Sequence, residues 1–491
     1  MPVAPVDIVL VKPGSQKSLY GELSTHQLTG IEPPLWAALL AAYLRNLGYA
    51  VELYDGEAEN WTYEETAQRI WETRPLLAAL VVSGTNPSAS TMNMTGAGQI
   101  LRILKGLDPT VKTLLAGLHP SALPERTLSE EVVDFVCQGE GFLTLPPLID
   151  ALKSKDRPGG IPGLWYKDES AVVPGARAPL MEDLDQLPRP AWDLLPMKVY
   201  RAHNWHCFGK IASRQPYAVL YTSLGCPFHC TFCCINALFG RNVIRYRAIE
   251  KVLEELDFLV HTYDVRNIKI IDEMFALSEK RVTELCDGMI ERGYDLNMWA
   301  YARVDTVTRK MLTKMKQAGI HWVAYGFESG SERVISDVRK GYSLDRVTKT
   351  VEMSYDSGIR ICANYIFGLP EDDYASMNET LKLMLDINAE WANMYCAMAY
   401  PGSKLYETAL AQGWPLPDSW ENYSQYAHGA LPLPTKYLSG GQVLSFRDYA
   451  FDTYFSNPRY LHKIKGEFGD ETVMHVKKMT EKKLSRKYAT L

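Results

Sequence analysis

The sequence predicts an α/β protein, with an N-terminal doubly wound, Rossmann-like parallel sheet followed by a partial (β/α)6 TIM-like barrel and a small, mostly helical C-terminal region. Two observations predict this fold. Short apolar runs alternate with helix-periodic segments twice along the chain, and a proline-rich stretch separates the two sets. We therefore expect a first domain at residues 1–155, a hairpin and linker at 156–210, a barrel at 211–410 and a C-terminal cap region at 411–491.

The composition is that of a large globular protein. The chain has 491 residues, 46% of them apolar and 22% charged, which excludes a disordered or fibrous chain. The net charge of -6 gives no indication of a basic surface that would bind nucleic acid. The nine cysteines are odd in number and unevenly spread, which does not fit a disulfide framework, so we expect the reducing environment of the cytoplasm. We expect neither a secretory signal nor a membrane span, because the longest apolar run, 33–47, is short and contains Arg45.

The first section alternates strands and helices. The expected strands lie at 6–11, 51–54, 77–82, 113–116 and 133–136, and the expected helices at 33–47, 62–72, near 98–107 and at 142–152. Thr62 and Glu65 have the spacing of a capping box at the start of the second helix. Strands that alternate with helices at this interval form a parallel sheet, and ligands of such sheets bind at the carboxyl ends of the strands.

Small and turn-forming residues stand at those ends, in the four segments 12–14, 83–86, 117–120 and 139–141. Glycines there let a bulky planar or phosphate-bearing ligand approach the backbone closely. No G-x-G-x-x-G follows the first strand, which argues against a dinucleotide fold of the dehydrogenase type.

A connector and a second series of βα units follow. Residues 161–173 read as a hairpin, and the prolines of 184–196 disfavour helix and strand alike and mark an inter-domain linker. The next expected strands lie at 218–222, 267–271, 298–303, 322–327, 361–367 and 391–399, separated by helices such as 249–261 and 279–292. Six such units form an open barrel, whose site lies at the carboxyl ends of its strands.

Three cysteines directly follow the first barrel strand. Cys226, Cys230 and Cys233 have C-x3-C-x2-C spacing, and three thiolates in one short loop bind three irons of a cubane cluster. No fourth cysteine at similar spacing follows, so one iron is left open to another ligand.

A zinc knuckle is the alternative interpretation of these cysteines. It requires a fourth ligand, and the nearby sequence offers His229, Cys234 or Cys207. We expect Cys234 to pack as an ordinary buried thiol.

The cysteine loop closely resembles that of the radical S-adenosylmethionine (SAM) enzymes, in which the open iron chelates SAM and the cluster cleaves its sulfonium bond. The segment Gly-Leu-His-Pro-Ser-Ala-Leu-Pro-Glu at 117–125 and the Gly-Glu-Gly step at 139–141 resemble the N-terminal domains of the cobalamin (B12)-dependent branch. The D-x-H-x-x-G motif of base-off/His-on cobalamin proteins is missing, since Gly56, Glu57 and Ala58 follow Asp55. Radical SAM relatives commonly lack that motif.

The resemblance implies which residues hold the cofactors. A [4Fe-4S] cluster is expected on the three cysteines. Residues expected to bind SAM are Phe232, Asp272, Glu273, Arg303, Glu328, Ser329 and Gly368. Residues expected to bind cobalamin are Pro13, Ser83, Gly84, Thr85, Gly117, Leu118, His119, Gly139, Glu140 and Gly141. For His119 two alternatives are open, contact with the corrin ring or capping of the following turn.

The implied function is methyl transfer from SAM, through methylcobalamin, to an unactivated carbon or phosphorus of a small-molecule or natural-product substrate, by way of a 5'-deoxyadenosyl radical. One alternative is a radical SAM/B12 cyclase or rearrangement enzyme without methyl transfer. An alternative of another class is a non-catalytic corrinoid-binding or metal-binding protein. The implied partners are a small-molecule substrate and an electron donor such as flavodoxin or ferredoxin.

Two C-terminal segments each allow two interpretations. The Trp/Tyr-rich stretch 414–426 either lines a substrate pocket or packs as core. The basic stretch 477–487 either forms a solvated terminal helix or favours an anionic surface.

Overall fold

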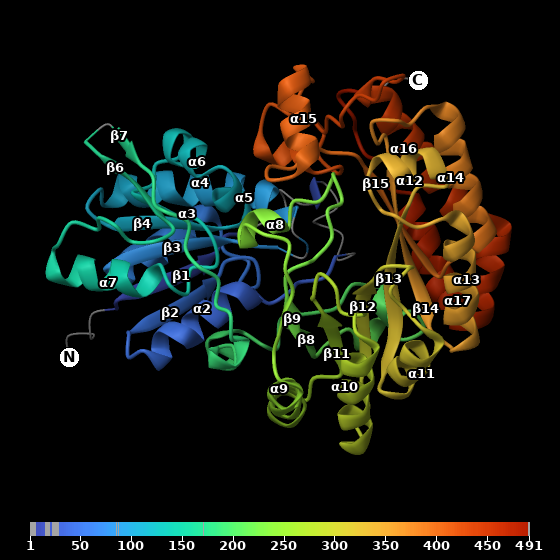
Figure 1. The fold of residues 1–491 in the computed structure, drawn as a ribbon, viewed down its shortest axis with the longest axis horizontal. Helices are drawn as coiled ribbons and strands as arrows, with labels where there is room; N and C mark the ends of the chain where they lie inside the picture. Colours follow the sequence, from blue (N-terminus) through green and yellow to red (C-terminus); the bar gives the residue numbers. More distant parts are fainter. Residues whose placement is uncertain are drawn as a thin grey trace.

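The computed structural model describes residues 6–14, 20–21, 29–84, 86, 88–169 and 171–489. Two sheets dominate the molecule and lie next to each other, a seven-stranded sheet formed by the first part of the chain and a six-stranded barrel sheet (Figure 1). The predicted α/β fold class, with a parallel sheet before a partial barrel and a helical C-terminus, is confirmed.

The N-terminal sheet has the strand order β2-β1-β3-β4-β5-β6-β7. Five strands are parallel: β1 (Ile8–Lys12), β2 (Val51–Asp55), β3 (Leu77–Val82), β4 (Lys112–Gly117) and β5 (Phe135–Cys137). Its helices are α2 (Leu35–Asn46), α3 (Tyr63–Thr73), α4 (Ala89–Leu107), α5 (Leu118–Ala122), α6 (Pro124–Glu130) and α7 (Leu145–Ser154). The capping box of α3 is present, with the Thr62 N–H donating to Glu65 at 2.8 Å.

Three details of this unit differ from the expectation. The short helices α5 and α6 follow β4, where only turn-forming residues were expected. The hairpin assigned to the connector, β6 (Leu164–Asp168) and β7 (Ala171–Val173), pairs antiparallel with β5 and extends the sheet. The inward side chains of Leu164 and Tyr166 are buried there, which ties the hairpin to the sheet. Helix α4 begins at Ala89 rather than near Gly98, because Ser90 and Asn93 donate to backbone carbonyls at the end of β3 and hold a first turn whose polar composition reads as a loop.

The second sheet is parallel throughout, in the order β15-β14-β13-β12-β11-β8, and stays open between β8 and β15. Its strands are β8 (Tyr217–Leu220), β11 (Asn267–Ile270), β12 (Asn297–Ala302), β13 (Ile320–Glu328), β14 (Arg360–Phe367) and β15 (Trp391–Cys396). The helices between them are α8 (Asn236–Phe239), α9 (Ile249–Tyr263), α10 (Glu279–Glu291), α11 (Arg309–Gln317), α12 (Glu332–Asp337), α13 (Leu344–Asp356), α14 (Tyr374–Ile387) and α15 (Lys404–Gln412). A short antiparallel pair, β9 (Ser223–Leu224) and β10 (Arg245–Tyr246), flanks the cysteine loop.

The linker after the hairpin is irregular, and several of its large side chains are buried. Its regular pieces among the described residues are short 3-10 turns at Leu184–Gln186, Trp192–Leu194 and Trp205–Cys207, and a further one at Ile211–Ser213 precedes β8. Trp192 is fully buried and donates to Glu255 of α9 at 3.2 Å. The ring of Trp205 packs against Trp299 and Trp322 inside the barrel. One continuous apolar core therefore runs through both sheets.

The C-terminal region contacts both units. Helix α16 (Gly440–Phe455) packs on β14 and β15 and α17 (Pro458–Thr480) follows it, on the outer side of the barrel (Figure 1). The turn at Trp420–Tyr423 instead lies against α4 of the N-terminal unit. None of the helices in the described part of the chain has the length and apolar character needed to cross a bilayer.

Candidate active site

The carboxyl ends of both sets of strands border one cavity of about 450 Å³, where parallel α/β architectures place their ligands. Predicted residues that line it are Ser83, Gly84, Gly117, Leu118, Cys226, Cys230, Phe232, Cys233, Glu273, Arg303 and Glu328. The structure therefore brings residues expected for all three cofactors to a single space.

The three cysteines face this space together. All three thiols are free of disulfides, and Cys230 Sγ lies 3.7 Å from a guanidinium nitrogen of Arg303. Burial raises the pKa of Cys226 to about 11, so this thiol is protonated at neutral pH unless it binds a metal ion. Three soft sulfur donors in one loop fit an iron–sulfur cluster.

The proposed fourth zinc ligands lie elsewhere or are buried. Cys207 sits in the barrel interior, where its thiol donates to Asn267 Oδ1 at 3.3 Å. His229 is exposed and is absent from the described residues that line the cavity. Cys234 is 3% exposed, which confirms its expected packing as a buried thiol.

Asp272 and Glu273 have different surroundings although they are neighbours. The carboxylate of Asp272 is fully buried and accepts hydrogen bonds at 2.6 Å from the Thr222 N–H and from the hydroxyls of Thr222 and Ser223. It braces the start of the cysteine loop behind the cavity. Glu273 lines the cavity and accepts from the Gly225 N–H at 3.0 Å, and burial raises its pKa to about 7.

A cluster of charged side chains lies beside the cysteines. Arg303 stacks on Phe228 at 3.9 Å and pairs with both oxygens of Asp305. Glu328 pairs with Lys340 at 2.7 Å, and both line the cavity. Glu328 adopts φ +57° where the register of β13 against β14 shifts, a strained backbone of the kind found at functional sites.

Ser329 and Gly368 are supports rather than cavity residues. The Ser329 hydroxyl hydrogen-bonds with Thr380 and accepts from the Ser331 N–H, both at 3.1 Å. Gly368 has φ +82°, and a Cβ there would lie 2.4 Å from a methyl carbon of Val443. Its N–H donates to Asp372 at 2.9 Å.

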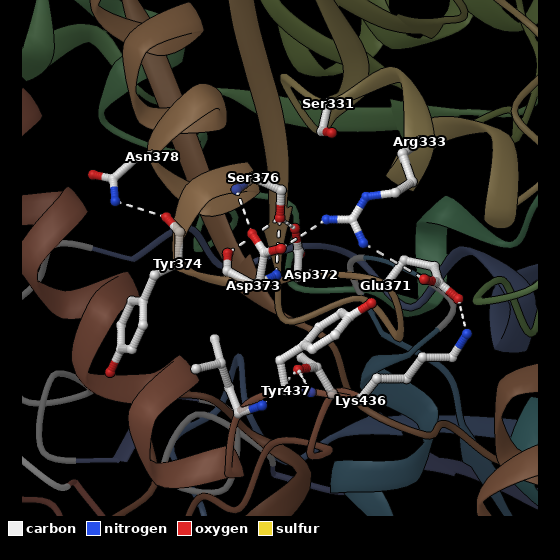
Figure 2. Close-up of polar contacts among 12 residues, drawn as sticks. Ser331, Arg333, Glu371, Asp372, Asp373, Tyr374, Ser376, Asn378, Lys436 and Tyr437 are labelled. Atoms are coloured by element: carbon white, nitrogen blue, oxygen red, sulfur yellow. Dashed lines mark hydrogen bonds and ion pairs between the residues drawn. The ribbon is translucent and has the colours of Figure 1, made fainter.

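Figure 2 shows the loop beyond Gly368. Ser376 donates to Asp372, and Asp373 caps the start of α14. Arg333 pairs with Asp373 at 2.9 Å and with Glu371 at 3.6 Å, and Lys436 pairs with the same Glu371. These contacts fix the exit of β14 next to the cavity.

The residues expected for cobalamin divide into two groups. Ser83, Gly84, Gly117 and Leu118 line the cavity, whereas Thr85 lies outside the described residues. Gly117 has φ +129°, and a Cβ there would approach the Val82 carbonyl oxygen to 2.5 Å, so the turn after β4 requires glycine. The others, Pro13, His119, Gly139, Glu140 and Gly141, are absent from the described lining of the cavity.

His119 points into the interface with the C-terminal region. Its Nδ1 lies 3.2 Å from the Thr91 hydroxyl, and its ring packs edge-on against Trp420 at 4.4 Å. Burial lowers the pKa of His119 to about 3, so the imidazole is neutral. These contacts are with Thr91 of α4 and with Trp420, and no described hydrogen bond has the imidazole capping the following turn.

Glu140 joins the two units through a buried ion pair. Its carboxylate accepts from Arg245 at 2.7 and 3.1 Å and from the Met181 N–H at 2.8 Å. The indole of Trp36 donates to the Glu140 carbonyl at 3.2 Å. Since Arg245 lies on β10, paired with the strand that enters the cysteine loop, this pair sets the loop against the N-terminal unit.

Several cavity residues were not predicted. They are mostly aromatic: Trp36, Phe228, Tyr221, Tyr301, Tyr395 and Tyr400, together with Lys340 and Asn364. Tyr301 could have been predicted from the sequence, because it stands two residues before Arg303 and alternate residues of a strand lie on the same face. Lys340 lies in a loop after α12, where periodicity gives no signal. In the stretch 414–426 both interpretations apply, since Tyr423 packs as core and residues 424–426 line the cavity.

Comparisons with known proteins match both units of the chain. Residues 23–149 match the family model "B12 binding domain", and residues 220–384 match "Radical SAM superfamily". An uncharacterized methyltransferase of Pyrococcus horikoshii is 30% identical over 457 residues, covering 93% of this chain and 94% of the relative. An anaerobic magnesium-protoporphyrin IX monomethyl ester cyclase of Rubrivivax gelatinosus is 26% identical over 78% of this chain and 67% of its own.

Among solved structures, the radical SAM methyltransferase TsrM of Kitasatospora setae, with cobalamin and a [4Fe-4S] cluster bound, has a TM-score of 0.69. The match covers 92% of this chain and 89% of that one at 16% identity, and shows that the fold is shared. From the two family models, the full-length relative and the cavity lined by residues of both units, the chain belongs to the cobalamin-dependent radical SAM enzymes, whose cofactors are a [4Fe-4S] cluster, SAM and cobalamin.

Proposed function

We propose that the protein transfers a methyl group from SAM, through cobalamin, to an unactivated carbon or phosphorus of a small molecule held in the cavity. The observation that carries the proposal is that the cysteine loop and the strand ends of the B12-binding unit line the same cavity. When bound, the cofactors supply the methyl group and the radical. The chain supplies their mutual position and a site closed to water.

In this proposal the three cysteines hold the cluster, and polar side chains around them hold SAM. Arg303 pairs with Asp305 through Nε and Nη2, and its Nη1, beside Cys230, donates to the SAM carboxylate. Glu273 and Glu328 accept from the SAM amino group and the ribose hydroxyls. Asp272, Ser329 and Gly368 position these groups from behind the cavity.

On the cobalamin side, Ser83, Gly84, Gly117 and Leu118 present backbone and small side chains to the corrin. Trp36, Tyr221 and Tyr400 complete an apolar wall that excludes water from the reacting atoms. The reaction needs a low-potential electron donor such as flavodoxin or ferredoxin, and the reduced cluster requires the cytoplasm.

The proposal is tested by anaerobic reconstitution with methyl-labelled SAM and a strong reductant. We expect 5'-deoxyadenosine and label in an acceptor molecule. Deoxyadenosine with an unlabelled product would reject methyl transfer and favour a cyclase, the activity named for the Rubrivivax relative. SAM left intact would point to a corrinoid carrier.

The ligand assignment has its own test. Replacing Cys230 by Ala should abolish both cluster absorbance and SAM cleavage, because one iron loses its thiolate. Cys286→Ala is the matched control, since Cys286 is buried in α10 away from the cavity. Cluster absorbance and cleavage that survive in Cys230→Ala would refute the assignment.

A further inference from the structure

A second chamber of about 310 Å³ adjoins the first cavity on the open side of the barrel. Four tyrosines line both spaces, so the two meet at these rings: Tyr20, Tyr301, Tyr395 and Tyr426. The chamber lies between residues of the barrel strands, the second half of α16, and the end of α17 with the segment that follows it. No cofactor-binding residue proposed above belongs to it.

The walls of this chamber combine aromatic rings with charged side chains. Besides the four shared tyrosines they contain the rings of Trp205, Trp299, Trp391 and Phe451, together with Lys269, Arg447, Asp448 and Asp452. Flat ring faces pack best against another flat ring system. The volume lies near the lower end of the range for small-molecule sites, roughly 300–1,000 Å³.

Arg447 brings a buried positive charge to the chamber. It is 5% exposed, and it donates from Nε to the Met394 carbonyl and from Nη1 to Asp448, both at 2.9 Å. Arg486 also pairs with Asp448, through both carboxylate oxygens. Two guanidinium groups thus share one carboxylate, which leaves a net positive charge.

One donor of Arg447 is still available. Within the described part of the chain, its Nη2 forms no hydrogen bond, and the guanidinium borders the chamber. Lys482 stands exposed at the chamber rim and has no ion pair with any described residue. A buried guanidinium with a free donor beside a cavity is suited to an anionic group of a ligand.

We propose that the second chamber holds the non-reacting part of the methyl acceptor, and that this acceptor is an anionic molecule with a planar unsaturated ring. Its carboxylate or phosphate pairs with Arg447, its ring lies among the aromatic walls, and its acceptor atom reaches the first cavity past Tyr301, Tyr395 and Tyr426. This inference rests on the proposed methyl transfer and adds the chemical class of the substrate.

The test measures binding of three probes to the anaerobic holoenzyme by calorimetry: 1-naphthoate, 1-naphthyl phosphate and the neutral 1-naphthalenemethanol. We expect at least one anion to bind about tenfold or more tightly than the alcohol, the size of one charge-assisted hydrogen bond. The stronger of the two anions identifies carboxylate or phosphate as the natural group. Equal binding of all three probes, or no binding, would overturn the inference.

Variants place the probe in the chamber. Arg447→Met should weaken binding of the anions about tenfold and leave the alcohol unchanged, whereas Arg459→Met, at an exposed arginine of α17, should change neither. Because Arg447 also braces Met394, Lys482→Met at the rim is the second variant, with an expected loss of two- to fivefold for the anions only. Unchanged anion binding in both variants would refute the inference. Label transfer from SAM is followed separately, so an unlabelled product tests the proposed function and not this site.

Discussion

Replacing Arg245 by Met should strongly destabilise the protein, because it breaks the ion pair between the two units. The side chains of Arg245 and Glu140 are only 4% and 3% exposed, and two hydrogen bonds join them. Without Arg245, the Glu140 carboxylate keeps the Met181 N–H as its remaining described partner. Leaving such a charge buried and unpaired costs about 3–5 kcal/mol in the free energy of unfolding.

The assay is urea unfolding of anaerobic holoenzyme, followed by circular dichroism. Arg241→Met is the matched control, since Arg241 precedes the same strand and pairs with Glu182 at the surface, where the side chains are 53% and 66% exposed. An exposed pair contributes about 0–1 kcal/mol. The double variant Glu140→Met/Arg245→Met should recover much of the loss, because well-packed apolar residues replace a buried pair at little cost. An Arg245→Met variant no less stable than Arg241→Met would refute the reasoning.

Three further predictions concern the barrel side. Lys340→Met should raise the KM for SAM at least tenfold, because it leaves Glu328 unpaired in the cavity wall. Lys349→Met, at an exposed lysine, is the control and should leave the KM unchanged. An unchanged KM in Lys340→Met would show that the Lys340–Glu328 pair does not contribute to SAM binding. Gly368→Ala should lower the free energy of unfolding by about 1–3 kcal/mol, because of the φ of +82° and the clash of the new Cβ with Val443. Adding Val443→Ala should recover the share of this loss that comes from the clash. An unchanged free energy of unfolding in Gly368→Ala would contradict the tight packing. Burial raises the pKa of Asp372 from 3.8 to about 6. Between about pH 4 and 6, Asp372 is therefore protonated in the folded state and ionised in the unfolded state. Its contribution to the free energy of unfolding consequently falls as the pH rises from about 4 to 6. Asp372→Asn should flatten that part of the stability profile, by roughly 1–3 kcal/mol between the ends, and equal profiles for the two proteins would disprove the shift.

The sequence predicted the strands well, because hydrophobic runs in fully buried parallel sheets are bounded by clear turn residues. The six barrel strands all lie at the expected places, and Thr62 caps α3 through Glu65 as its spacing indicated. The start of α4 was less visible, since its first turn is held by polar side chains that also favour loops. The pairing of the hairpin at 164–173 with β5 is a long-range contact that no local pattern encodes.

At the site, local spacing identified the cysteines but could not orient every neighbour. Asp272 and Glu273 follow the same strand, yet only Glu273 faces the cavity, because successive residues turn to opposite sides. Lys340 and Tyr426 reach the cavity from loops far along the chain. Their roles follow from tertiary packing, which periodicity does not report.

The segment after the barrel supplies walls for both chambers, through Gln425 and Tyr426 in the first and Arg447 in the second. The cysteines and the strand ends of the B12-binding unit come from earlier in the chain. Part of the wall of the proposed substrate site is therefore encoded after the residues that line the cofactor cavity. Exchanging residues 411–491 for the corresponding region of a relative is a way to change the methyl acceptor while the residues proposed to bind the cofactors stay the same.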